Sequence, residues 1–169
     1  RIFEEALRKR NMPYRIYGGL SFYQRKEVKD LIAYFRMVVN PDDSEALKRV
    51  INYPARGIGA TTLSKLESNA GMYGVSIWKV ITNTDKFPLE INKGTLAKIQ
   101  GFAQMIHNFI KIKNENDAYD LARLIASESG LLKDLSNGNT IEERSRYENV
   151  EELLNGMKDF VEGRMAVPG

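Results

Sequence analysis

Apolar residues recur at every third or fourth position through most of this chain, and this helical spacing limits the folds that it can adopt. Between residues 21 and 39 they form one stripe along a helix, made of Phe22, Val28, Leu31, Ile32, Phe35, Val38 and Val39. Further helical stretches are predicted within residues 46–51, 63–70, 76–81, 96–110, 121–132 and 147–161. The sequence therefore predicts a mainly α-helical domain.

Prolines and polar residues mark where the predicted helices begin and end. The Asn-Pro pair at residues 40–41 ends the first of them, and "PDDSE" at residues 41–45 offers Asp and Ser caps for the next. Pro54 stops that second helix. We expect Thr61 or Thr62 to cap the helix that follows.

The N-terminal residues follow a different pattern. A short exposed helix is predicted at residues 1–10, and "PYRIYGG" at residues 13–19 predicts one β-strand that is stopped by Gly18-Gly19. Because one strand cannot form a sheet, its partner strands are expected in a longer protein. We therefore interpret the chain as a fragment, an expectation that the lack of an initiator Met supports.

The composition disfavours several classes of function. The chain has no Cys, which excludes disulfides, and no apolar run approaches the roughly 20 residues of a membrane span. It has no G-x-x-x-x-G-K-S/T phosphate loop, and its only histidine, His107, lies on the polar side of a predicted helix. Adjacent acidic pairs such as Glu142-Glu143 diverge on a helix rather than converge. We predict no catalytic residue and no metal site within this chain.

The basic residues gather in the first part of the sequence. Residues 1–65 hold 13 Lys and Arg against 7 Asp and Glu, whereas residues 66–169 hold 12 against 15. This asymmetry suggests a polyanion such as nucleic acid, although a chance patch on a solvated surface explains the charge alone about as well.

A glycine-containing turn lies in the basic part, in "NYPARGIGATTLSKL" at residues 52–66. A helix, a tight turn with glycines and a second helix form a helix–hairpin–helix arrangement, in which glycine permits positive φ and close approach of another molecule. We expect the amides of Gly57, Ile58 and Gly59 to point outward unpaired, where they could bind a DNA phosphate oxygen. Ile58 would also anchor the turn on the core.

Side chains around this turn could add further contacts to the phosphate. Arg56, Thr61, Thr62 and Lys65 offer hydroxyl or charged groups, and the basic pair at residues 48–49 could widen the patch. Such contacts read the DNA backbone, so binding would be independent of sequence and sensitive to salt. The alternative is a helix C-cap followed by a loop glycine, with no ligand. The flanking helical spacing and basic residues favour the binding interpretation.

Several motifs in order closely resemble the UvrD/PcrA/Rep-like superfamily 1 DNA helicases. They are "PYRIYGG", F-x-x-R-K-E-V-K-D-L-I-A-Y-F-R from residue 22, "NPDD" from residue 40 and "NYPARGIG" from residue 52. The later stretch "SRYENVEELL" is also similar to the family, whereas residues 71–139 match only in helical character.

The resemblance implies a domain organisation. The family has two RecA-like motor domains, 1A and 2A, with insertions 1B and 2B. By this resemblance, residues 1–22 are a remnant of 2A, made of a helix and one strand of its α/β sheet, and residues 23–169 are the all-helical 2B domain. Gly18, Gly19 and Phe22 would lie at the hinge between them.

The resemblance also implies a function. In this family the 2B domain contacts duplex DNA through helix–hairpin–helix turns, and Gly57, Ile58 and Gly59 occupy the matching motif. The parent protein would be an ATP-dependent 3′→5′ DNA helicase of the bacterial cytoplasm, associated with the nucleoid. It would use ATP and Mg²⁺ at junctions of single-stranded and duplex DNA during repair or replication. This chain lacks the ATPase motifs, so alone it is predicted neither to hydrolyse ATP nor to unwind DNA.

Two other interpretations stay open at this stage. The chain could be a protein-interaction or autoinhibitory helical module of the same helicase that does not bind DNA, with a partner on its apolar or acidic half. It could also belong to a related helicase–nuclease subunit, which a nuclease domain downstream would reveal.

Overall fold

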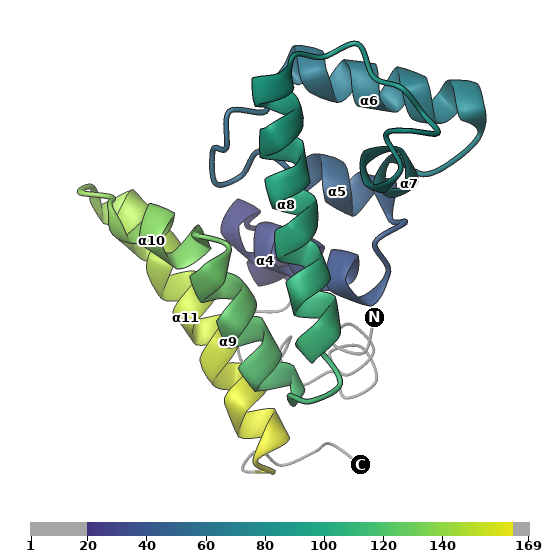
Figure 1. The fold of residues 1–169 in the computed structure, drawn as a ribbon. Coiled ribbons are helices and arrows are strands. Elements are labelled where there is room, and N and C mark those ends of the chain that lie inside the picture. The colour runs from purple at the N-terminus through teal and green to yellow at the C-terminus, as the bar shows by residue number, and fades with distance from the viewer. Residues whose placement is uncertain (1–19, 164–169) are drawn as a thin grey trace.

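The structure is a computed structural model that describes residues 20–163. Over this range the chain forms helices and no strand (Figure 1), namely α3 (Leu20–Tyr23), α4 (Lys26–Val39), α5 (Ser44–Val50), α6 (Ala60–Tyr73), α7 (Ile77–Thr82), α8 (Lys93–Ile112), α9 (Ala118–Glu128), α10 (Leu131–Ser136) and α11 (Ile141–Val161). The predicted mainly α-helical fold is confirmed for these residues. The predicted strand, Gly18 and Gly19 lie outside them.

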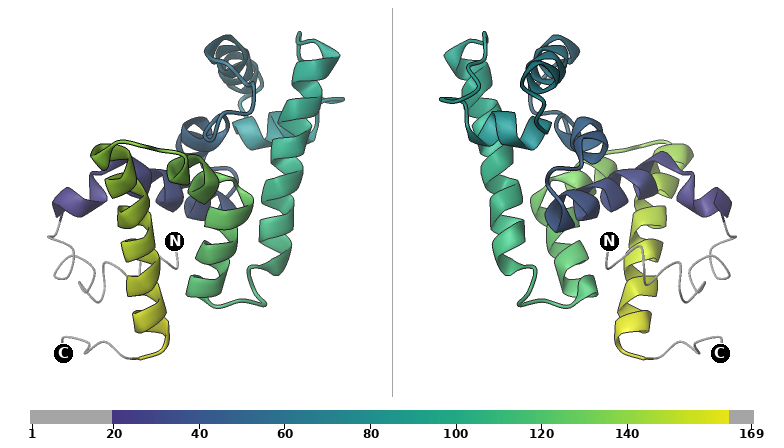
Figure 2. Two further views of the ribbon diagram at one scale, coloured as in Figure 1. Left: turned by 90° about the vertical axis from the view of Figure 1, so that its left-hand side faces the viewer. Right: turned by 90° about the vertical axis from the view of Figure 1, so that its right-hand side faces the viewer.

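Helix α4 lies at the centre of the fold (Figures 1 and 2). It packs against α5, α8, α9 and α11, which lie around it. The predicted stripe faces the core, with Val28, Leu31, Phe35 and Val38 buried. Because α4 has neighbours on several sides, residues outside that stripe are buried as well, among them Glu27, Asp30, Tyr34 and Met37.

The remaining helices form two groups that α8 connects. Figure 1 shows α5, α6 and α7 on one side of the molecule and α9, α10 and α11 on the other, and the long helix α8 runs past both. Helix α8 contacts α7, α4 and α9 in turn. None of the described helices is long and apolar enough to span a membrane.

The predicted helix at residues 21–39 is interrupted near its start. The backbone of Arg25 is extended, with ψ at 138°, and separates α3 from α4. The amides of Gln24 and Arg25 donate instead to the carbonyls of Ser21 and Phe22, three residues earlier, so α3 closes as a tight turn. Phe22 is buried in this turn, and nothing described tests its predicted position at a hinge.

The helix caps agree only partly with the sequence. The Asp43 carboxylate accepts a hydrogen bond from the Ala46 amide at 3.1 Å, which confirms the predicted cap of α5. The prediction that Thr61 or Thr62 caps the next helix is wrong. Gly59 is the N-cap of α6 and has no side chain that could accept a hydrogen bond. Because α6 begins at Ala60, both threonines lie inside its first turn.

Candidate nucleic-acid interface

Of the two glycines in the turn between α5 and α6, only Gly57 has the positive φ that the sequence suggested. Gly57 has φ at +77°, in the left-handed region that favours glycine. Gly59 is extended and is the N-cap that precedes α6, and both glycines are exposed. Ile58 between them has only 1% of its surface exposed and is part of the core. The expectation that Ile58 anchors the turn is therefore confirmed.

The side chain of Asn52 holds the turn from within. Its Oδ1 accepts hydrogen bonds from the amide of Arg56 at 2.7 Å and from the amide of Ile58 at 3.1 Å. The expectation that the Ile58 amide is unpaired is therefore wrong. Because one side-chain oxygen accepts from the amides on both sides of Gly57, it holds the backbone from Arg56 to Ile58 in one conformation.

The other amides of the turn remain open. Within the described residues, the amides of Gly57 and Gly59 make no hydrogen bond, nor do those of the first turn of α6, from Ala60 to Thr62. Most of these residues are exposed. A helix N-terminus carries partial positive charge on such amides, and the turn adds the amide of Gly57. The arrangement can accept an anion.

A lysine from a distant part of the sequence lies over this turn. A side-chain carbon at position 57 would be 2.7 Å from Nζ of Lys98, an exposed residue of α8. Sequence reasoning missed Lys98 because it lies 41 residues after Gly57 and no local pattern connects the two. The ammonium group of Lys98 places a full positive charge beside the open amides.

The predicted basic neighbours of the turn differ in what they contact. Lys65 is exposed on α6 and donates to the carbonyl of Glu90 at 3.1 Å. Lys48 pairs with Glu45 at 2.8 Å and Glu67 at 3.2 Å, and these hydrogen bonds raise the pKa of Lys48. Arg49, the other member of the predicted pair, is bound by the buried carboxylate of Asp30. The protein's own carboxylates therefore pair with both residues at 48–49, and the expectation that this pair widens the patch stays a prediction.

Arg56 points inward instead of toward solvent. Its Nη1 donates to the carbonyls of Val50 at 2.8 Å, Ile51 at 3.3 Å and Tyr53 at 3.3 Å, and its Nη2 donates to the carbonyl of Ser129 at 3.0 Å and to the hydroxyl of Tyr34. A guanidinium engaged by five protein oxygens is not placed to add a phosphate contact, which corrects the sequence-based expectation for this side chain.

Tyr34 extends this inward network into α4. Its hydroxyl donates to the carbonyl of Tyr53 and accepts from Arg56. Burial raises the pKa of Tyr34 to about 12, although the neighbouring Arg56 opposes the shift. The hydroxyl therefore keeps its proton at neutral pH and remains a donor.

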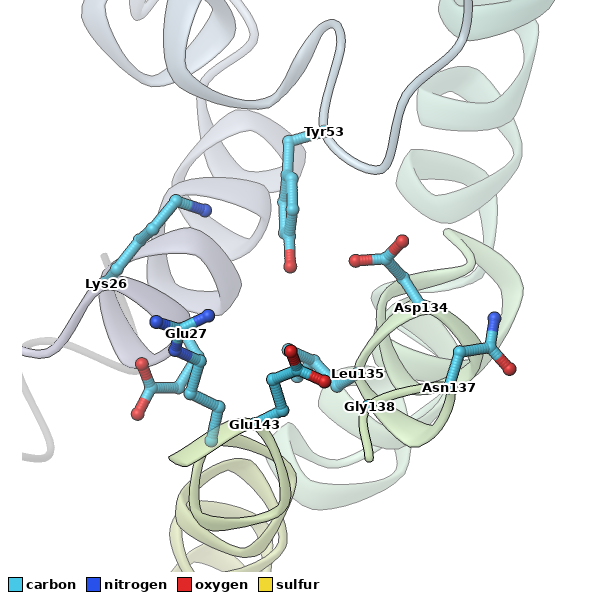
Figure 3. Close-up of a pocket in the computed structure, with 9 residues that line it drawn as sticks. Lys26, Glu27, Tyr53, Asp134, Leu135, Asn137, Gly138 and Glu143 are labelled. Carbon is cyan, nitrogen blue, oxygen red and sulfur yellow. The ribbon is translucent and has the colours of Figure 1, made fainter. Parts of the chain in front are cut away.

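A pocket of about 410 Å³ lies on the other side of Tyr53, between α4, α10 and the start of α11 (Figure 3). Figure 3 shows the Tyr53 hydroxyl facing Asp134, and burial together with this carboxylate raises the pKa of Tyr53. The pocket is also lined by two basic side chains, Lys26 and Arg146, and by two further carboxylates, Glu27 and Glu143. With three carboxylates and two cations, it does not favour a phosphate group.

Comparison with known proteins places the chain in a family. A family model described as the UvrD-like helicase C-terminal domain matches residues 1–166, and the chain belongs to this family. The chain is 39% identical over 160 residues to the ATP-dependent DNA helicase PcrA of Leuconostoc citreum and 36% identical over 160 residues to that of Bacillus subtilis (strain 168). It is 34% identical over 162 residues to PcrA of Staphylococcus aureus.

These alignments cover 95–96% of this chain but only 21–22% of the relatives. The chain thus spans about one fifth of the length of the curated relatives that it matches.

Proposed function

We propose that this chain is the duplex-binding 2B region of an ATP-dependent DNA helicase, with residues 1–22 belonging to motor domain 2A and residues 23–169 to 2B. The family and the names of the relatives support the parent activity. The observation that carries the role of this chain is the α5–α6 turn, where exposed amides lie open beside the ammonium of Lys98. Such a site suits a phosphate of duplex DNA.

In this proposal the backbone of the turn makes the central contact. The amides of Gly57, Gly59 and Ala60 donate to phosphate oxygens, and Lys98 neutralises the phosphate charge. Lys65, one turn into α6, binds a neighbouring phosphate after releasing the Glu90 carbonyl. None of these groups reads a base, so the duplex is held without sequence preference and with an affinity that falls as salt rises.

Duplex binding by the turn would regulate unwinding through the orientation of the 2B domain. The proposed hinge at Gly18, Gly19 and Phe22 would let 2B turn relative to motor domains 1A and 2A, as linked domains commonly do. Binding the duplex ahead of the junction would then favour one orientation, because a ligand stabilises the conformation to which it binds more tightly.

ATP and Mg²⁺ would act in the whole helicase, outside these residues. The sequence contains no G-x-x-x-x-G-K-S/T loop, and among the described residues no group of three His, Cys, Asp or Glu could hold a metal ion. These residues do not fit a nucleotide–metal site, so no step of the mechanism of this chain involves one. Since the relatives are bacterial, we place the parent protein in the bacterial cytoplasm with the nucleoid.

The proposal predicts salt-dependent binding that Lys98 strengthens. In a fluorescence anisotropy titration, the chain should bind a labelled duplex of arbitrary sequence at about 50 mM salt, and affinity should fall steeply at higher salt. Lys98→Gln removes one cation paired with a phosphate. It should therefore reduce the slope of log affinity against log salt by about 0.9.

Lys111→Gln is the matched control for this titration. Lys111 is exposed on the same helix as Lys98, and at 1.5 Å per residue it lies about 20 Å further along. It should leave the slope unchanged. The proposal is contradicted if the wild-type chain does not bind at low salt, or if the two variants change the slope equally.

A further inference from the structure

The side chain of Arg56 joins three parts of the protein behind the binding turn. Within α5 and the residues after it, the guanidinium binds the carbonyls of Val50, Ile51 and Tyr53. Across the fold it binds the carbonyl of Ser129, 73 residues further along the chain. Arg56 directly precedes Gly57, and its side chain therefore connects the turn to the end of α5 and to the end of α9.

These acceptors suit a partly buried cation. Val50 and Ile51 end α5, and Ser129 is the C-cap of α9, so the guanidinium meets the negative ends of two helices. It also lies over the ring of Phe102, with Cζ 5.4 Å from the ring centroid. The five donors of arginine can serve several carbonyls at once, whereas the ammonium of lysine cannot reproduce that planar geometry.

The contact with Phe102 links Arg56 to the cation over the turn. Phe102 is buried on α8, four residues after Lys98, and therefore lies on the same side of that helix one turn away. Arg56 thus contacts the helix that carries Lys98 while it is adjacent in sequence to Gly57. The distance between the open amides and the ammonium depends on this packing.

The turn between α9 and α10 supports the same region. Gly130, with φ at +90°, follows Ser129, and a side-chain carbon there would lie 3.6 Å from Cγ of Pro54. The hydroxyl of Ser129, itself buried, accepts from the amide of Leu131. The α9–α10 turn is therefore seated against the α5–α6 turn and presents the Ser129 carbonyl to Arg56.

We propose that Arg56 is a positioning residue for duplex binding. It does not touch the DNA but holds the amides of the turn and the ammonium of Lys98 at the spacing that one phosphate group requires. This inference rests on the proposed function. It adds that the affinity of the turn depends on packing with α8 and α9, which provide no amide to the phosphate.

The test separates positioning from direct contact by measuring affinity and salt dependence together. Arg56→Lys keeps the charge but loses the planar fork. Affinity for a labelled duplex should fall roughly tenfold, as expected if the turn holds its binding conformation for only about a tenth of the time. Arg56→Gln should weaken binding at least as much. Both variants should keep the wild-type salt slope, because no phosphate-paired cation is lost.

A second variant keeps the test decisive if the Arg56 variants fold poorly. Tyr34→Phe removes only the hydroxyl that accepts from Arg56, and it should weaken binding severalfold at an unchanged slope. Arg144→Lys, on the exposed face of α11, is the control and should behave as wild type. Each affinity is measured at a temperature at which circular dichroism shows that the variant is fully folded.

The outcomes distinguish this inference from the proposed function. Absence of binding by the wild-type chain would contradict the proposed function itself. If the wild-type chain binds, Arg56→Lys at wild-type affinity would overturn the positioning role, as would a slope lowered by about 0.9 in Arg56→Gln. Where neither Arg56 variant folds, wild-type affinity in Tyr34→Phe would overturn it.

Discussion

Gly57→Val should weaken duplex binding by about 100-fold or more while the chain still folds. Valine is β-branched and strained at φ +77°, and its Cβ would lie 2.7 Å from Nζ of Lys98. The turn would change shape and the ammonium would move. Losing two charge-assisted hydrogen bonds at about 1.5–3 kcal/mol each corresponds to a loss of that size. Anisotropy gives the affinity, and urea unfolding gives the stability.

Gly74→Val is the matched control for this substitution. Gly74 is also left-handed, with φ at +63°, and lies at the other end of α6, where a Cβ added to it would have no heavy atom within 4 Å apart from its chain neighbours. The backbone strain is of the same kind, so Gly74→Val should lose a similar amount of stability. Its affinity for the duplex should stay unchanged. An equal loss of affinity in both variants, or none in Gly57→Val, would show that the turn does not bind DNA.

Ile58→Ala should reduce the free energy of unfolding by about 2–4 kcal/mol. Ile58 is among the largest fully buried side chains and is the residue of the Gly-Ile-Gly triplet that enters the core. Truncation would leave a cavity beneath the turn as well as removing apolar contacts. Urea unfolding measures the loss, and the milder Ile58→Val should cost about 0.5–1.5 kcal/mol. Equal, small losses in both variants would show that Ile58 does not anchor the turn.

The sequence was sufficient to predict the helical fold because apolar spacing is local information. The stripe on α4 and the cap at Asp43 are confirmed, since each depends on residues within one or two turns of one another. The Gly-Ile-Gly turn is another local feature, because Gly57 adopts the positive φ that glycine favours and Ile58, between two glycines, is the one large apolar side chain of the triplet.

The parts of the candidate site that sequence could not provide depend on tertiary packing. Lys98 reaches the turn because α8 passes beside it, and Arg56 faces inward because Ser129 offers a carbonyl from a distant helix end. A basic residue next to a glycine turn looks like a phosphate ligand in the sequence alone. The cap at Gly59 was missed because threonine is a common N-cap and two of them follow directly.

Asn52 illustrates a signal that was present but not used. An asparagine a few residues before a glycine turn can accept hydrogen bonds from the backbone amides of that turn, as it does here for Arg56 and Ile58. Including it would have corrected the prediction that all three amides of the triplet are unpaired.

The central claim is that the open amides of the α5–α6 turn bind a phosphate of duplex DNA. Titrating the ¹⁵N-labelled chain with a short duplex and recording ¹H–¹⁵N correlation spectra tests it most directly. The amide signals of Gly57, Gly59, Ala60 and Thr61 should shift in a saturable way, while that of Ile58 should shift less because Asn52 already binds it. Saturable shifts confined to another surface, such as α11, with these four amides unchanged, would contradict the claim.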